Sequence, residues 1–256
     1  MNPWLMSAVM VVAWSVFALQ MMIKIGALKK MAPESRMDQI PRRIGLLFKI
    51  GIGQEKLVGR SRERMPGIMH ALIFWGAMLI GIREVTLMGE GFVHGFQEYL
   101  PLLGSNYLSG FLFIYLYNIA ELVVLLMILV ALYRRFVPRP DRLDLNWEGV
   151  YVLIFIAGIM LTDLLFDAAR FNLIDEWQYS LHQFEHPVYG QERSWAPVAS
   201  ALAVLLVGLG ETSNSFFYHF GFWGHIATML VFVNILINTK QFHEITALPN
   251  VFLGSL

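Results

Sequence analysis

Histidines near the ends of apolar segments are the residues of this sequence best suited to redox chemistry. His225 and His243 lie 18 positions apart in the stretch 216–252, and five turns of α-helix return such positions to one face. On one continuous helix the two imidazoles would lie about 27 Å apart, close to the thickness of a bilayer's hydrocarbon core. Imidazoles are common axial ligands of haem iron. The spacing therefore predicts one haem ligand near each edge of a membrane span.

His70 and His243 form a second candidate pair. If the segments 66–87 and 216–240 are antiparallel spans, both imidazoles lie near the same membrane edge and can approach one iron from opposite sides. Basic residues at this level could pair with haem propionates, and they are Arg60, Arg64 and Lys240. Ordinary alternatives are snorkelling of the basic chains to lipid phosphate, and hydrogen bonding of a histidine to a nearby carbonyl.

The composition indicates a polytopic membrane protein. Of 256 residues, 57% are hydrophobic and only 15% are charged, which is too apolar for an ordinary soluble domain. No cysteine is present, so any iron–sulfur centre must belong to a partner. We expect an all-α bundle forming a single domain over 1–256, with five transmembrane helices at about 3–23, 66–87, 107–132, 150–166 and 216–240.

The charge distribution predicts the orientation of these spans. The stretch 24–64 carries eleven Lys and Arg against four acids, so the positive-inside rule makes it cytoplasmic, with the N-terminus outside and the C-terminus cytoplasmic. The apolar segment 195–209 is shorter than the roughly 20 residues of a full span. If it crossed, His243 would move to the face opposite His70. We therefore expect a partly inserted or interfacial helix on the outer side, with a sixth span as the alternative.

Four motifs carry a resemblance to a known family: RMPGIMHALIFWG at 64–76, LTDLLFDAAR at 161–170, FWGH at 222–225 and TKQFHEITALPNVF at 239–252. They resemble the nitrate reductase gamma subunit family of cytochromes b. The chain resembles more closely the membrane domain of a subfamily joined to iron–sulfur proteins of the heterodisulfide reductase type, some of which pass electrons from electron-transfer flavoprotein to quinone. The resemblance implies haem b, with the inner haem bound by His70 and His243 and the outer haem by His225.

The same resemblance leaves the outer haem without an evident second ligand. Two-haem relatives have a second histidine ten residues after the first on the second span, and the matching position here is Ile80. His219 is rotated by about 240° from His225 on an ideal helix, so the two cannot bind one iron from the same helix. Either one haem is bound, or the outer iron takes its second ligand from the remaining histidines, which are His94, His182 and His186.

Ionisable residues in the spans suggest proton chemistry. Asp163, Asp167 and Arg170 lie at i, i+4 and i+7, on one face of a helix. With Arg83, they form either helix-end salt bridges or a site beneath the 195–209 helix, near His225, where a quinone or menaquinone exchanges protons. Glu121 lies well inside a span, where a bare carboxylate is costly. We expect it to be hydrogen-bonded between helices or to belong to a proton path.

The implied function is electron transfer between a cytoplasmic iron–sulfur subunit of the heterodisulfide reductase type and the quinone pool, in a prokaryotic cytoplasmic membrane. Electron-transfer flavoprotein is a further expected partner, and nothing indicates nucleic-acid binding. One alternative is a haem-free membrane anchor of an iron–sulfur oxidoreductase. Another is a membrane zinc hydrolase, because His182, Glu185 and His186 match the motif H-x-x-E-H.

Overall fold

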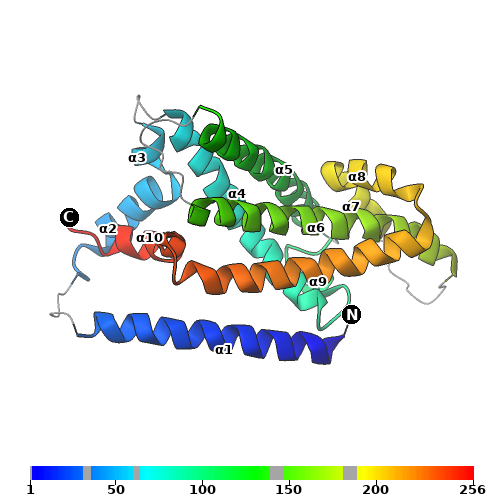
Figure 1. Ribbon diagram of the computed structural model, residues 1–256, viewed down its shortest axis with the longest axis horizontal. Coiled ribbons are helices and arrows are strands. Elements are labelled where there is room, and N and C mark those ends of the chain that lie inside the picture. The colour runs from blue at the N-terminus through cyan, green and yellow to red at the C-terminus, as the bar shows by residue number, and fades with distance from the viewer. Residues whose placement is uncertain (1, 31–35, 60–63, 106, 139–146, 181–188) are drawn as a thin grey trace. The chain divides into compact units, whose positions relative to one another are not determined.

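Long helices dominate the computed structural model, which describes residues 2–30, 36–59, 64–105, 107–138, 147–180 and 189–256 (Figure 1). Five are long and apolar enough to cross a membrane: α1 (Pro3–Leu28), α4 (Arg64–Glu90), α5 (Leu108–Phe136), α6 (Trp147–Ser180, with its apolar part Trp147–Leu173) and α9 (Gly210–Leu236). The expected all-α architecture with five such helices is confirmed.

Shorter helices connect or follow these five. They are α2 (Ile40–Leu46), the π-helical turn η1 (Leu47–Ile52), α3 (Glu55–Val58), the 3-10 turn η3 (Phe96–Tyr99), α7 (Tyr189–Trp195), α8 (Pro197–Val207), the 3-10 turn η4 (Lys240–Phe242) and α10 (His243–Phe252). The long helices expose large apolar side chains such as Val11, Leu129 and Leu161. Lipid tails can cover such side chains, and the helical backbone satisfies its own polar groups within the bilayer.

The chain divides into two compact units. The first unit comprises 1–7 and 76–229, and the second comprises 8–75 and 230–256. The helices α1, α4 and α9 contribute residues to both units. The expectation of a single domain over the whole chain stays a prediction.

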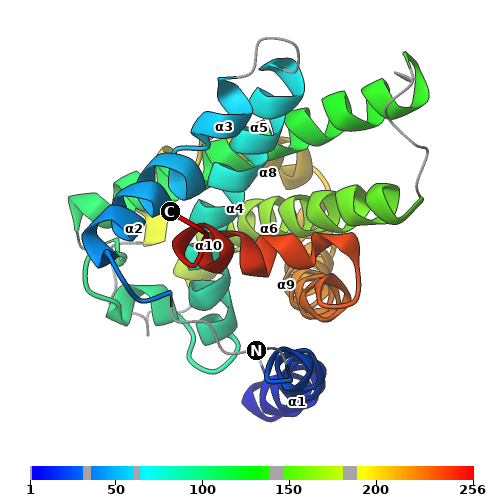
Figure 2. The same ribbon diagram turned by 90° about the vertical axis from the view of Figure 1, so that its left-hand side faces the viewer.

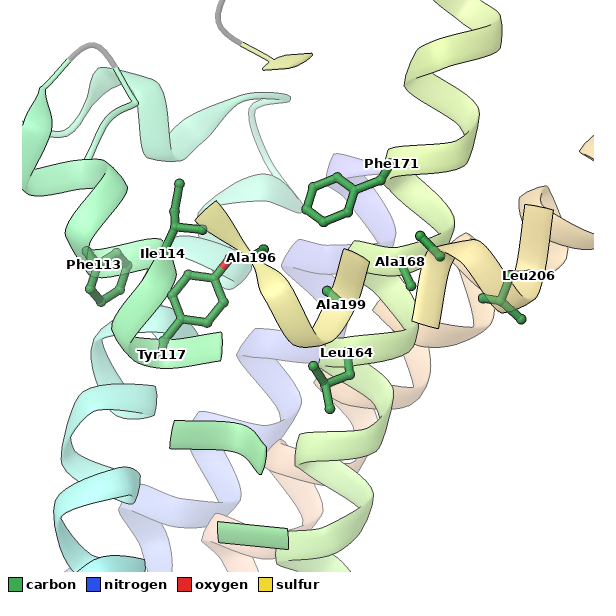
Figure 3. Close-up of a cluster of buried hydrophobic side chains, with 10 residues drawn as sticks. Phe113, Ile114, Tyr117, Leu164, Ala168, Phe171, Ala196, Ala199 and Leu206 are labelled. Carbon is green, nitrogen blue, oxygen red and sulfur yellow. The ribbon is translucent and has the colours of Figure 1, made fainter. Parts of the chain in front are cut away.

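In the first unit α8 packs on α5 and α6 (Figure 1). Its inner face consists of small residues, and Ala199 and Ala203 are fully buried. Small side chains allow helix backbones to approach closely. Figure 3 shows Ala199 among side chains of the neighbouring helices, including Tyr117 and Leu164. The opposite face of α8 exposes Leu205. The short apolar helix expected at 195–209 is thus present, and it covers part of this unit's core.

In the second unit α10 packs against α2 and η1, and Figure 2 shows α10 in red beside α2 in blue. Arg43 fixes this contact from a buried position. Its guanidinium donates to the carbonyls of Phe252 at 2.9 Å and Gly254 at 2.7 Å, and it pairs with Asp38 at 2.6 Å. The hydrogen bond from Arg43 lowers the pKa of the Asp38 carboxyl. Arg43 thereby anchors the end of the described chain to α2.

The helix α9 ends at Leu236, several residues before His243. The backbone then turns, and the side chain of Thr239 accepts a hydrogen bond from the backbone N–H of Gln241 as the N-cap of η4. His243 is the first residue of the next helix, α10. The expectation that His225 and His243 share one face of a continuous helix is therefore wrong, because a threonine N-cap starts a new helix between them.

The helix α6 is longer than the expected span at 150–166, and its apolar part extends to Leu173. The acids Asp163 and Asp167 therefore lie inside the apolar segment rather than at its end. They do not end the helix because their charges are paired, as described below.

Candidate functional site

His70 of α4 and His243 of α10 face each other in the second unit. Their ring centres are 6.2 Å apart and their ring planes are inclined by 23°. With a metal–nitrogen bond of about 2.0 Å and a ring nitrogen roughly 1.2 Å from the ring centre, two axial imidazoles on one iron have centres about 6 Å apart. The separation of the two ring centres therefore matches that of two imidazoles bound to one iron.

The hydrogen bond of His243 also suits a metal ligand. Its Nδ1 lies 2.9 Å from the backbone carbonyl oxygen of Lys240, which can only accept a hydrogen bond. Nδ1 must therefore carry the hydrogen, which leaves the lone pair of Nε2 available. A metal-ligating histidine commonly donates its second ring N–H to a backbone carbonyl, which fixes the tautomer and the ring orientation. The side chains of both His70 and His243 are exposed to a ligand.

Basic residues accompany this histidine pair in the sequence. Arg64 is the first residue of α4, and Lys240 is the first residue of η4; the side chains of both are exposed. Arg60 lies outside the described residues. Arg64 and Lys240 stay predictions as partners of haem propionates.

His225 has a different environment in the first unit. It is fully buried, its Nδ1 lies 3.0 Å from the carbonyl oxygen of Ile159, and its Nε2 lies 2.8 Å from a carboxylate oxygen of Glu84. Both ring nitrogens are therefore engaged by oxygen atoms, and neither lone pair is directed at open space. This geometry does not fit an axial ligand, and an outer haem on His225 stays a prediction that the residues around it do not support.

Among the described residues, no other histidine is placed as a second ligand for an outer haem on His225. His94 is exposed, with its Nδ1 3.9 Å from Glu90, and His219 is exposed, with its ring edge against Tyr218. The motif formed by His182, Glu185 and His186 lies outside the described residues. Among the described side chains, no group of three or more His, Asp or Glu is arranged to hold a metal ion.

A buried ion-pair network occupies the interior of the first unit. The Arg83 guanidinium contacts both oxygens of Asp163, with Nε–Oδ2 at 3.2 Å and Nη2–Oδ1 at 3.1 Å, and also contacts Asp167 Oδ1 at 2.9 Å. The Tyr117 hydroxyl donates to Asp167 Oδ2 at 2.8 Å. The Tyr117 ring also lies beneath the guanidinium, 4.8 Å from the Arg83 Cζ atom. At most 3% of the side-chain surface of Arg83 and of the two aspartates is exposed, so their mutual pairing replaces water.

Arg170 extends this network to α7. Its Nη2 lies 3.2 Å from Asp167 Oδ1 and 2.7 Å from Glu192 Oε2. Burial raises the pKa of the Glu192 carboxyl to about 7. The nearby Glu98 also raises this pKa, whereas the neighbouring Arg170 guanidinium lowers it. A carboxyl group that takes up a proton near neutral pH therefore lies at the end of the network.

Glu121 is the carboxyl group at the other end. It is 1% exposed, and Asn118 Nδ2 donates to its Oε2 at 3.1 Å. Its Oε1 is buried and accepts no hydrogen bond from the described residues, although it belongs to a side chain within hydrogen-bonding reach of Asp163. We refer to the whole network as the buried charge cluster, and its members are Arg83, Glu98, Tyr117, Glu121, Asp163, Asp167, Arg170 and Glu192.

The structure brings together the four residues expected at a quinone or proton site, namely Arg83, Asp163, Asp167 and Arg170. Sequence reasoning missed Glu84, Tyr117 and Glu192. A signal existed for Tyr117, because it lies one helical turn before Glu121 and on the same face. Glu84 lies inside the span expected at 66–87, so it could have been recognised there as an intramembrane acid. Glu192 lies in a short polar segment and carried no such signal.

Five apolar helices, a facing histidine pair and a buried charge cluster define a helical membrane protein with a candidate redox centre. The chain is similar to two curated oxidoreductases. It is 28% identical over 249 residues to the probable iron-sulfur-binding oxidoreductase FadF of Bacillus subtilis (strain 168), and 22% identical over 249 residues to the EtfAB:quinone oxidoreductase of Syntrophomonas wolfei subsp. wolfei (strain DSM 2245B / Goettingen).

These two matches cover 96% of this chain but only 32% and 33% of the relatives, so the chain spans about a third of their length. No family model and no solved structure matches the chain.

Proposed function

We propose that this chain is a haem b-containing membrane subunit that transfers electrons between a cytoplasmic iron–sulfur partner and the membrane quinone pool. The observation that carries the proposal is the facing pair of His70 and His243, with ring centres 6.2 Å apart. The names of the two relatives support it, since one is described as iron-sulfur-binding and the other as a quinone oxidoreductase. The five apolar helices support a membrane location.

His70 and His243 would hold the haem iron through their imidazoles. When bound, the haem would supply one-electron transfer. The backbone carbonyl of Lys240 orients the His243 ring and keeps Nε2 as the ligating nitrogen. Each histidine lies in one of the motifs that resemble the nitrate reductase gamma subunit, at 64–76 and 239–252. We therefore infer a cytochrome b of that type, closest to the heterodisulfide reductase-linked subfamily.

A single haem is the form of this proposal that the residues favour. His225 uses both ring nitrogens within the helix bundle, where it joins α9 to Ile159 of α6 and to Glu84 of α4. We assign it a structural role between these helices. A buried imidazole with two oxygen partners stabilises the packing of three elements and does not need a cofactor to be satisfied.

The buried charge cluster is the proposed location of the proton chemistry. Reduction of a quinone takes up two protons as well as two electrons, so a quinone-reactive subunit needs ionisable groups inside the membrane. Buried charges in a membrane segment are costly and commonly mark ion or proton pathways. Arg83, Asp163, Asp167 and Arg170 are the candidates, and α8 packs on α6, the helix that carries the last three of them.

Basic residues indicate the side of the membrane on which we place the soluble partner. Exposed Arg42, Lys49 and Lys56 belong to the loop predicted to be cytoplasmic. We place the iron–sulfur subunit of the heterodisulfide reductase type on that side, with electron-transfer flavoprotein as its donor or acceptor. The N-terminus would then be outside and the C-terminus cytoplasmic, in a prokaryotic cytoplasmic membrane.

The visible absorption spectrum of the detergent-purified chain tests this function. We expect reduced-minus-oxidised bands of haem b in the wild type and in a His94→Ala control, which removes an exposed histidine outside the site. The bands should disappear in His70→Ala and in His243→Ala, because either change removes an axial ligand. A wild-type chain that binds its iron–sulfur partner without haem would instead be a membrane anchor, and stoichiometric zinc lost with His182→Ala would indicate the hydrolase.

A further inference from the structure

Two contacts between carboxyl groups lie at the ends of the buried charge cluster. At one end Glu121 of α5 lies within hydrogen-bonding reach of Asp163 of α6. At the other end Glu192 of α7 lies within hydrogen-bonding reach of Glu98 of η3. Two ionised carboxylates in contact repel each other, whereas one shared proton converts the contact into a strong O–H···O bond.

The first pair has only one chemically consistent arrangement. Both oxygens of Asp163 already accept from the Arg83 guanidinium, so Asp163 is the ionised partner. Glu121 Oε2 accepts from Asn118, while Glu121 Oε1 is buried and no described residue directs a hydrogen-bond donor at it. An oxygen that carries a proton needs an acceptor rather than a donor. Glu121 Oε1 therefore suits a protonated carboxyl oxygen beside the Asp163 carboxylate.

The second pair repeats this arrangement closer to the surface. Glu98 Oε2 accepts from the backbone N–H of Ser105 at 2.9 Å, and Glu98 Oε1 is buried without a donor among the described residues. Glu192 Oε2 contacts Arg170 at 2.7 Å. Glu98 is partly exposed, whereas Glu192 is buried, so this pair joins the interior to the surface of the unit.

The charge balance of the cluster also requires protons. Within the part of the chain that the structure describes, the ion pairs of its five carboxyl groups (Glu98, Glu121, Asp163, Asp167 and Glu192) involve two guanidinium groups, those of Arg83 and Arg170. Tyr117 is a neutral donor to Asp167 and compensates no charge. Four of the five carboxyl groups are buried, so full ionisation would leave at least two uncompensated negative charges in a low-dielectric interior, which is strongly unfavourable. One proton on each carboxyl pair reduces this excess to a single charge.

We propose that the buried charge cluster stores two exchangeable protons, one shared by Glu121 and Asp163 and one shared by Glu192 and Glu98, and exchanges them with a quinone. The quinone part of this proposal rests on the proposed function. Two electrons from the iron–sulfur partner and two protons convert a quinone to a quinol, forming one O–H bond on each quinone oxygen. One carboxyl O–H bond breaks in Glu121 and one in Glu192, and water restores both protons through the Glu98 end.

The groups around each pair set its protonation. Asp163, Asp167 and Arg83 face Glu121 from α6 and α4, and Asn118 faces it from its own helix. Arg170 and Asp167 face Glu192 from α6, and Glu98 faces it from η3. His225 adds a positive charge near Asp163 when its imidazole is protonated. Each shared proton therefore lies close to one of the two arginines and to at least one of the two aspartates that pair with these arginines.

Infrared spectroscopy of the full chain in lipid nanodiscs tests the proton store directly. We expect two carbonyl-stretching bands of protonated carboxyl groups, both shifted in heavy water. Glu121→Gln should remove one band and Glu192→Gln the other, and only the Glu192 band should titrate near neutral pH. The control Glu211→Gln removes an exposed carboxyl from the first turn of α9 and should leave both bands unchanged.

Retention of both bands in Glu121→Gln and Glu192→Gln would overturn the proposal, and so would their absence from the wild type. Because glutamine at a buried site can prevent folding, Glu121→Asp is the second variant. It keeps the carboxyl group, and its band should shift in frequency rather than disappear. An unshifted band in Glu121→Asp would assign the proton to another residue.

The infrared result needs neither haem nor quinone, so it separates this proposal from the proposed function. Two assigned bands in a chain without haem would support the proposal of two stored protons and refute the proposed cytochrome function. Quinone coupling has its own readout, the number of protons taken up per quinone reduced in haem-replete protein. Wild-type proton uptake and wild-type rates across the pH range in a Glu121→Gln/Glu192→Gln double variant would overturn the coupling alone.

Discussion

The histidine pair and the buried charge cluster use polar side chains in opposite ways. His70 and His243 are exposed, and among the described residues the only hydrogen bond of either ring joins His243 Nδ1 to a backbone carbonyl. Arg83 and Asp163, in contrast, are almost fully buried and satisfy each other with two hydrogen bonds. A metal ligand needs a lone pair that accepts no hydrogen bond, whereas a buried charged group needs hydrogen bonds and an opposite charge. The first region thus has the free lone pair that the proposed haem requires, and the second has the paired charges that the proposed proton chemistry requires.

His225 sharpens this comparison because it is the same residue type in the other environment. It is buried with an oxygen beside each ring nitrogen, whereas His243 keeps Nε2 available. A histidine near the end of an apolar segment therefore does not identify a haem ligand by itself. The hydrogen bond on its second nitrogen and the presence of a facing imidazole make the distinction.

The largest effect on the cluster is expected from Arg83→Leu. The change leaves Asp163 and Asp167 buried beside each other without their shared cation, and breaking such a pair costs about 3–5 kcal/mol. The free energy of unfolding in bicelles measures this loss. Arg42→Leu, at an exposed arginine, should change the stability by less than about 0.5 kcal/mol. Equal stabilities of the two variants would contradict the account of the cluster.

The pH dependence of stability should reveal Glu192. Its folded-state pKa of about 7 lies above the ordinary value of 4.5, so the folded chain binds more protons between these two pH values. Stability should therefore fall as the pH rises from about 4.5 through 7, by at most about 3 kcal/mol, and then level off. Glu192→Gln should remove this slope, and Glu211→Gln should retain it. A slope that persists in Glu192→Gln would assign the proton elsewhere.

A smaller effect is expected from Asn118→Ala. The Asn118 side chain connects the buried charge cluster to α8. Asn118 Oδ1 accepts from the backbone N–H groups of Val198 and Ala199 at the start of α8, while its Nδ2 donates to Glu121. Losing it leaves buried polar groups without partners, at a cost of about 2 kcal/mol. Amide exchange in α8 should accelerate. Asn238→Ala, which removes an exposed amide, is the control, and equal exchange rates in the two variants would refute this connection.

The smallest effect is expected at the histidine pair from Thr239→Ala. Thr239 caps η4, the turn that holds the Lys240 carbonyl against His243. Losing an N-cap costs about 1 kcal/mol, so haem affinity should fall roughly fivefold while the spectrum stays that of a bis-histidine haem. Haem titration of the apoprotein measures the change. Thr246→Ala, which removes a hydroxyl without a capping role, should bind haem with wild-type affinity.

Local periodicity was enough to predict part of this molecule. Hydropathy predicted the five long helices, and the spacing of Asp163, Asp167 and Arg170 predicted one shared face, because both signals lie within a single helix. The pairing of His225 with Glu84 depends on which helices pack together, so no local pattern contains it.

The ends of helices were the least predictable feature. The span expected at 150–166 ended before Asp167, but Arg83 of another helix compensates the charges of Asp163 and Asp167 and α6 continues. The expected span ran to 240, whereas α9 ends at Leu236 and the N-cap at Thr239 starts a new helical turn. In both places a tertiary or capping interaction decided what hydropathy could not. The facing of His70 and His243 was nevertheless expected, because it followed from antiparallel spans rather than from one continuous helix.

The ratio of haem to chain tests the central claim most directly, because it treats the two kinds of histidine in one experiment. The account predicts one haem b per chain in the wild type, one in His225→Gln, and none in His70→Gln or His243→Gln. The loss of packing contacts around His225 should lower the stability of its variant without removing the cofactor. Two haems per wild-type chain, with one lost in His225→Gln, would contradict the account, and so would full haem content in His243→Gln.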